Sequence, residues 1–202
     1  KSDYDKALDY YFQALNLSKN LNNKSFIAGH YNSIGLAYTY KGETKSGLNY
    51  LLKSLEISKE IKDEKSSAVT MDFIGYTYYL MGKYPEALSY LTKSLEINRK
   101  LGDKIRIIDN LRNIGEVKTK TNNFKDAENC FNEALKTSEE LGHLHGIETN
   151  HEALSKLYEK SGQSNLALVH YKKYIATRDS FNTIENEKKQ LATEMNYEFD
   201  KK

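Results

Sequence analysis

Hydrophobic positions along this chain recur at steps of three and four residues, which is the spacing of one face of an α-helix. In the stretch 44–61, the apolar residues that follow this spacing are Leu48, Leu51, Leu52, Leu55 and Ile57. Pro85 is the only proline among 202 residues. Proline removes a backbone donor and clashes with the preceding turn, so its near absence favours long helices. The pattern predicts an all-α chain.

The helical pattern repeats every forty residues. Asn-Ser-Ile-Gly at 32–35 returns as Asp-Phe-Ile-Gly at 72–75 and as Arg-Asn-Ile-Gly at 112–115, and a fourth copy ends with Ser155 in place of the glycine. A column of small residues keeps the same step and contains Ala7, Gly47, Ala87, Ala127 and Ala167. A column of large residues contains Tyr11, Leu51, Leu91, Phe131 and Tyr171. A fixed step of this length indicates stacked supersecondary units, each too small to bury its apolar face alone.

Each unit holds two predicted helices, separated by residues that end or begin a helix. The second helix of each pair is expected near 4–21, 44–61, 84–101, 124–141 and 165–181, and the first near 25–41, 65–81, 104–121 and 145–161. Glycines fall where first helices should stop, at Gly42, Gly82 and Gly162, because glycine accepts the left-handed conformation of a helix end. Asp63 and Asp103 stand where a carboxylate can cap the next helix, and Pro85 lies in a first helical turn.

These columns resemble the tetratricopeptide repeat family in its longer, forty-residue variety. Residues that carry the resemblance include Ile34-Gly35 with Tyr38, then Gly47, Leu51 and Ser54, and their equivalents forty residues on. Lys118 replaces the expected tyrosine in the third unit, and Tyr174 replaces a small residue in the last. The resemblance implies an all-α, right-handed superhelical solenoid of antiparallel helix pairs, with a C-terminal extension helix.

The forty-residue step also divides the chain. We expect a tetratricopeptide array over 1–181, with a half repeat at 1–24 and full repeats near 25–64, 65–103, 104–143 and 144–181. Because the chain opens on a second-type helix, we expect the natural protein to continue upstream. Residues 182–202 form either a helix that caps the last repeat or a coiled-coil linker able to support a dimer, with a thin apolar stripe at Ile184, Leu191 and Met195.

Composition narrows the functional classes. The net charge is +2, from 30 basic and 28 acidic residues, and no basic block marks a nucleic-acid surface. No run of 18 apolar residues exists, so this fragment is not expected to insert into a membrane. Cys130 stands alone, and His143, His145 and His151 lack acidic or cysteine partners at a metal-binding spacing. With no catalytic motif either, we expect a non-enzymatic chain without cofactor or metal.

A stacked array of this kind curves, and its concave face is lined mainly by the first helix of each pair. Positions on those helices that face away from the second helix are candidates for binding a protein or peptide. They are Asn32, Leu36, Tyr40, Asp72, Tyr76, Tyr79, Arg112, Glu116, Glu152 and Lys156, with Leu80, Thr119 and Glu159 on the same faces. Asn32 can hold an extended peptide backbone, as asparagines do in related peptide-binding arrays.

Two interpretations of the candidate face stay open. Tyr40, Tyr76 and Tyr79 can serve recognition, because tyrosine offers contact area and a hydroxyl at low entropic cost, or they can fill space between repeats as expected for Tyr38 and Tyr78. The later, charged half is either part of the groove or a solvated surface.

The end of the chain adds a second resemblance. Glu-Met-Asn-Tyr-Glu-Phe-Asp-Lys-Lys at 194–202 is similar to the junction in bacterial membrane-bound sensor histidine kinases, where tetratricopeptide repeats lead into a coiled coil and a membrane span. That resemblance implies a periplasmic sensor region of a larger signalling protein, whose kinase or cyclase domain lies outside this fragment. The alternative is a stand-alone cytoplasmic scaffold that mediates protein–protein interaction.

Overall fold

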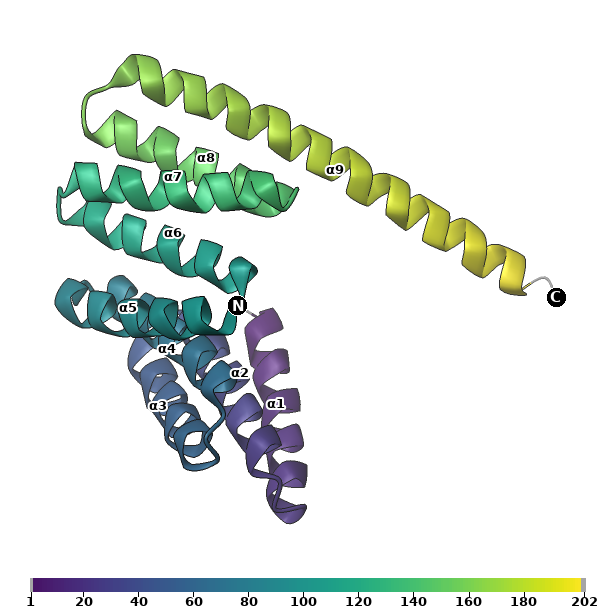
Figure 1. The fold of residues 1–202 in the computed structure, drawn as a ribbon. Helices are drawn as coiled ribbons and strands as arrows, with labels where there is room; N and C mark the ends of the chain where they lie inside the picture. The colour runs from purple at the N-terminus through teal and green to yellow at the C-terminus, as the bar shows by residue number, and fades with distance from the viewer. Residues whose placement is uncertain (1, 201–202) are drawn as a thin grey trace.

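The computed structural model folds residues 2–200 into nine α-helices, joined by loops of two or three residues and with no strand among them (Figure 1). Side chains are described for residues 3–180, 182 and 183. The helices are α1 (Ser2–Asn20), α2 (Lys24–Lys41), α3 (Thr44–Glu60), α4 (Glu64–Leu80), α5 (Tyr84–Leu101), α6 (Lys104–Lys120), α7 (Phe124–Glu140), α8 (Leu144–Lys160) and α9 (Ser164–Asp200). The predicted all-α class is confirmed, and the ends of α1 to α8 lie within two residues of their predicted places.

Helix ends follow the predicted local signals. Gly42, Gly82 and Gly162 adopt φ angles of 91°, 73° and 79°, the left-handed conformation that ends a helix without steric cost at glycine. The Asp63 carboxylate accepts from the Ser66 backbone N–H at 2.9 Å and so caps α4. Asp103 caps α6 in the same way, by accepting from the Arg106 N–H at 3.1 Å, so both predicted caps are confirmed.

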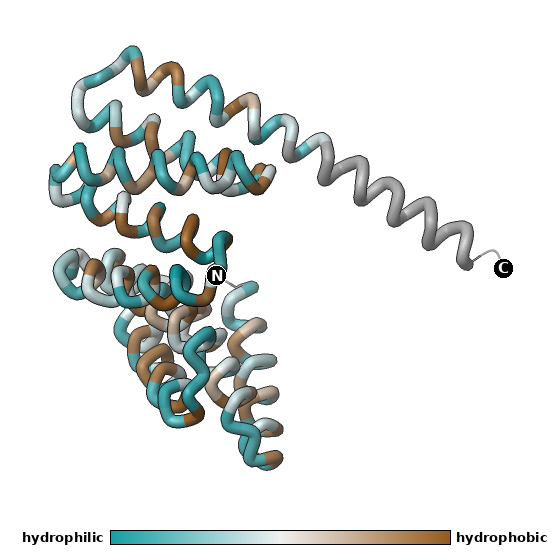
Figure 2. Tube along the Cα trace, in the orientation of Figure 1, coloured by the Kyte–Doolittle hydropathy of each residue, from teal (hydrophilic) through white to brown (hydrophobic). Residues whose placement is uncertain are grey.

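The helices stack into a solenoid of two layers. Each helix packs against its neighbours in sequence, and α2, α4, α6 and α8, the first helices of the four full pairs, also contact one another in that order. These four helices therefore form one continuous surface, which we call the A-helix face. Apolar residues recur as short bands along the helices of the array (Figure 2), and no helix of the described chain is long and apolar enough to cross a membrane.

Small residues set how closely paired helices approach. A Cβ atom added to Gly35 on α2 would lie 2.7 Å from Cγ of Leu51 and 2.9 Å from the Gly47 carbonyl oxygen on α3. Leu51 is fully buried, so neither atom has free space to move into. The repeated glycine thus exists to let the first helix of a pair touch the second, and this contact fixes the position of the A-helix face.

The last helix differs from the segmented prediction, because α9 runs unbroken from the last repeat through the predicted extension. No Gly or Pro interrupts 164–200, so no local signal stops the helix. In Figure 1 its C-terminal half projects beyond α8. The predicted stripe of Ile184, Leu191 and Met195 lies outside the described side chains. On the part that is described, Tyr171 is 51% exposed, whereas Leu51, Leu91 and Phe131 in the same column are buried.

Candidate binding groove on the A-helix face

Five tyrosine rings from four helices form a continuous row. Consecutive centroids lie 6.4 Å apart for Tyr4 and Tyr40, 6.2 Å for Tyr40 and Tyr76, 6.2 Å for Tyr76 and Tyr79, and 6.3 Å for Tyr79 and Tyr84. These distances are those of favourable offset or edge contacts between aromatic rings. We call these five residues the tyrosine row. It joins α1, α2, α4 and α5 across repeat boundaries.

The middle of the row has its rings partly exposed and its hydroxyls unengaged. Tyr40 is 51% exposed, and Tyr76 and Tyr79 are half-buried. None of the three hydroxyls makes a hydrogen bond to a residue in the described part of the chain. Partial burial raises the pKa of Tyr40 and Tyr76, and burial together with nearby Glu116 raises the pKa of Tyr79 to about 12. All three hydroxyls are therefore neutral donors at physiological pH.

Two other tyrosines, which the sequence placed between repeats, stack on rings within a helix pair. Tyr38 stacks on Tyr50 with centroids 5.6 Å apart, and Tyr78 stacks on Tyr90 at 5.7 Å. Both contacts join the first helix of a pair to the second. They contribute to the core rather than to the groove.

A pocket of about 290 Å³, the central pocket, opens beside the tyrosine row. Its walls come from α2, α4 and α6 and consist of Tyr40, Asp72, Phe73, Tyr76, Arg106, Asp109, Arg112, Asn113 and Glu116. Two ion pairs lie along its rim, one between Arg106 and Asp109 at 3.7 Å and one between Arg112 and Glu116 at 2.8 Å.

Asp72 forms the buried floor of the central pocket. It is 6% exposed, and its Oδ1 accepts from Nδ2 of Asn110 at 2.7 Å and from Nδ2 of Asn113 at 3.0 Å. Burial raises the pKa of Asp72, while the two amide donors and Arg112 act in the opposite direction. The sequence placed Asp72 on the open groove surface; the structure instead buries it at the base of a pocket, because the α6 amides cover it.

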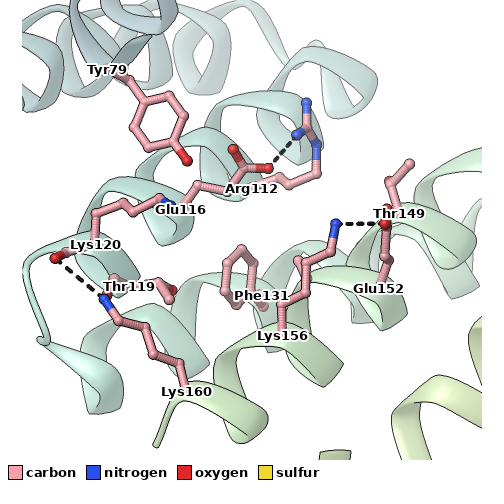
Figure 3. Close-up of a pocket in the computed structure, with 11 residues that line it drawn as sticks. Tyr79, Arg112, Glu116, Thr119, Lys120, Phe131, Thr149, Glu152, Lys156 and Lys160 are labelled. Carbon is pink, nitrogen blue, oxygen red and sulfur yellow. Dashed lines mark hydrogen bonds and ion pairs between the residues drawn. The ribbon is translucent and has the colours of Figure 1, made fainter. Parts of the chain in front are cut away.

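A second pocket of about 400 Å³, the distal pocket, continues the groove toward α8 (Figure 3). It is lined by Tyr79, Arg112, Glu116, Thr119, Lys120, Phe131, Thr149, Glu152, Ala153, Lys156 and Lys160. Lys156 pairs with Glu152 at 2.5 Å, and Lys160 donates to the Thr119 carbonyl oxygen at 2.7 Å. Three lysines and one arginine stand against two glutamates, so this pocket carries excess positive charge.

All predicted groove residues except Asn32, Leu36, Leu80 and Glu159 line one of these two pockets. Asn32 and Leu36 are half-buried on α2 and line neither. The sequence prediction missed Arg106 and Asp109, although they precede Arg112 on the same face of α6 at helical spacing. It also missed Lys160, whose role depends on the contact between α6 and α8 and has no local signal.

The histidines that lie close together in the sequence, His143, His145 and His151, do not form one site in the described part of the structure. His143 caps α8, its Nδ1 accepting from the Gly146 N–H at 3.1 Å. His151 is buried, and its Nδ1 lies 3.1 Å from Nδ1 of His170 on α9. Burial, helped by His170 and Lys173, lowers the pKa of His151 to about 4. Among the described residues no three His, Cys, Asp or Glu side chains converge as metal ligands, and burial raises the pKa of the Cys130 thiol.

The nine helices of residues 2–200 and the A-helix face form a helical-repeat solenoid. Residues 26–100 match the family model described as "Tetratricopeptide repeat". No curated protein sequence matches the chain.

Solved structures show the same fold at low sequence identity. BtubC from P. vanneervenii is 19% identical, with a TM-score of 0.76, and 89% of this chain covers 75% of that one. Aspartyl phosphate phosphatase F from Bacillus subtilis is 17% identical, with a TM-score of 0.80, over 90% of this chain and 49% of that chain. The Rap conjugation gene regulator of plasmid pLS20, in complex with the Phr* peptide, is 22% identical, with a TM-score of 0.77, over 90% and 50%. This chain thus spans about half the length of the last two proteins.

Proposed function

We propose that this chain is a peptide-binding module that holds an extended segment of a partner protein along the tyrosine row and the two pockets. The observation that carries the proposal is that the partly exposed rings of Tyr40, Tyr76 and Tyr79 are continuous with both pockets on one face. Tyrosines bury large area with few rotatable bonds, and these three hydroxyls have no hydrogen-bond partner among the residues that the structure describes. A peptide laid over them would supply those partners.

Similar folds support a peptide as the ligand. The pLS20 Rap regulator was solved with the Phr* peptide, and a Rap protein was solved with the Competence and Sporulation Factor. The groove of the present chain has features suited to such a ligand, namely two adjoining pockets that share Arg112 and Glu116, with polar groups at their rims. Of the two interpretations of Tyr40, Tyr76 and Tyr79, the partly exposed rings beside two pockets favour recognition of a ligand over filling of space between repeats.

The proposal extends to the role of the module in a larger protein. Our first candidate is a sensory input region of a bacterial signalling protein, such as a histidine kinase. The reason is that α9 begins in the last repeat and continues beyond it as one long helix, so a ligand that shifts the repeats can shift this helix as well. A periplasmic location and a dimer through that helix belong to this candidate. The second candidate is a cytoplasmic scaffold. The full gene separates them: a membrane span with an output domain after residue 202 supports sensing, and a stop codon there supports the scaffold.

The binding function is tested with a random octapeptide library presented to the purified chain. Peptides that are retained should lose affinity at least tenfold in the Tyr76→Ala, Tyr79→Ala double variant, measured by fluorescence polarisation. Tyr10→Ala is the matched control, since Tyr10 is 71% exposed and lies outside both pockets. A chain that retains no peptide, or a double variant that binds as well as the control, contradicts the proposal.

A further inference from the structure

Asp72 is a buried carboxylate without a cation of its own. The two arginines of the central pocket are already paired, Arg106 with Asp109 and Arg112 with Glu116. Within the described part of the chain, the Asp72 carboxylate accepts hydrogen bonds from two neutral amides alone, and both of them donate to its Oδ1. No donor in the described part of the chain reaches its other oxygen, Oδ2. Once Asp72 is ionised, three carboxylates face two guanidinium groups in this pocket, and the surplus negative charge is the most buried of the three.

A second polar atom beside the same pocket also lacks a hydrogen-bond donor among the described residues. The Oδ1 atom of Asn113 is buried and has no hydrogen-bond partner among the described residues, and Asn113 is 6% exposed. The orientation of its amide is fixed, because Nδ2 must face the Asp72 carboxylate. A buried acceptor without a partner costs free energy, and because Asn113 lines the central pocket, a donor bound there can remove this cost.

The walls above these acceptors suit a positive charge. Tyr40 and Tyr76 present partly exposed rings at 6.2 Å from each other, and the faces of aromatic rings attract cations. The distal pocket has the opposite character, because Lys120, Lys156 and Lys160 repel a cation there. The charge of the groove thus assigns a positively charged group to the central pocket alone.

We infer that the central pocket binds the cationic nitrogen of the peptide, a lysine or arginine side chain or a free N-terminal amine, between Tyr40, Tyr76 and Asp72. This inference rests on the proposed peptide-binding function and specifies its ligand. The cation donates to Asp72 Oδ2 and Asn113 Oδ1, and the tyrosine rings shield the resulting pair from water. An ion pair formed at so buried a carboxylate discriminates strongly against neutral groups, because a neutral ligand leaves the charge buried and unpaired.

The experiment uses the random octapeptide library in two forms, with free and with acetylated N-termini. Retained peptides should contain lysine or arginine in both forms if a side chain is bound, or be retained only in the free form if the terminal amine is bound. Replacing the cationic residue by norleucine, or acetylating the terminus, should weaken binding to the wild-type chain at least tenfold. This arm needs no protein variant and therefore does not depend on the folding of one.

The protein side of the test is Asp72→Asn, which keeps the shape and the Oδ1 acceptor but removes the charge. It should weaken the same peptides at least tenfold and abolish the difference between lysine and norleucine peptides, as expected for direct partners. Asp9→Asn, on the exposed surface of α1, is the charge-matched control and should bind normally. Affinity in the wild type should rise with pH as Asp72 ionises, and this rise should vanish in Asp72→Asn.

The outcomes separate the two proposals. Peptides that depend on Tyr76 and Tyr79 but carry no cation, or that bind Asp72→Asn with wild-type affinity, overturn the inference and leave peptide binding in place. A library from which nothing is retained overturns both.

Discussion

Replacing Gly35 by alanine tests whether the paired helices touch as closely as the structure shows. The added Cβ would lie 2.7 Å from Cγ of Leu51 and 2.9 Å from the Gly47 carbonyl oxygen. The second atom belongs to the backbone of α3, and Leu51 is fully buried, so α2 and α3 must separate to admit the methyl group. Overpacking of a core commonly costs about 1–3 kcal/mol, and a backbone clash belongs at the upper end.

Gly29 on the same helix supplies the matched control. Apart from the neighbouring residues and backbone of α2 itself, no described part of the chain lies within 4 Å of a Cβ placed there. Both glycines lie in the interior of α2, so either alanine gains about 0.8–1 kcal/mol of helix propensity. We therefore expect Gly29→Ala to stabilise the chain by roughly 0.5–1 kcal/mol and Gly35→Ala to destabilise it by roughly 2 kcal/mol. Propensity cancels between the two variants, so their difference, about 3 kcal/mol, measures the close approach.

Urea unfolding at 25 °C, followed by far-UV circular dichroism, gives both free energies of unfolding from midpoint and slope. Repeat arrays can unfold in parts. Hydrogen exchange should therefore show that Gly35→Ala lowers the protection of the amides in α2 and α3 more than that of amides in other helices. Equal stabilisation by the two substitutions would refute the argument, since it would mean that α2 and α3 are no closer at Gly35 than at Gly29.

Three further predictions concern charged and titratable groups. The pKa of His151 is lower in the folded chain than in the unfolded one, so stability should fall by roughly 2–3 kcal/mol as the pH drops from 7 to 4. His151→Phe removes the pair with His170 and should reduce this loss of stability, as measured in thermal melts. Burial raises the pKa of Asp72, so the folded state holds this proton to a higher pH than the unfolded state does. The stability of the wild type should therefore fall as the pH rises above about 4. The melting temperature of Asp72→Asn, relative to that of the wild type, should increase with pH. Arg99 and Glu133 form a 2.7 Å pair that is half exposed on both sides, and Glu133→Gln should change the unfolding free energy by less than about 0.5 kcal/mol, an effect that 0.5 M salt should erase.

Much of the candidate groove followed from the forty-residue repeat. Helical spacing from the glycine column selects one face of each first helix, and that face carries Tyr40, Tyr76 and Arg112 on the walls of the pockets. Spacing along a helix, however, does not show how deeply a side chain is buried. It assigned Asp72 and Asn32 to the same open surface, whereas Asp72 is buried beneath the amides of the next repeat and Asn32 lines neither the central nor the distal pocket.

The sequence by itself determined the elements and their order, because their signals are local. Left-handed glycines such as Gly42, capping carboxylates such as Asp63 and three- to four-residue spacing act within one or two turns. Only the tertiary structure decided which polar groups meet. Asn110 reaches Asp72 from 38 residues away, and His151 meets His170 across two helices. Such pairs depend on the angle at which successive repeats stack, which is the summed result of packing at many interfaces and is written in no single segment of the chain.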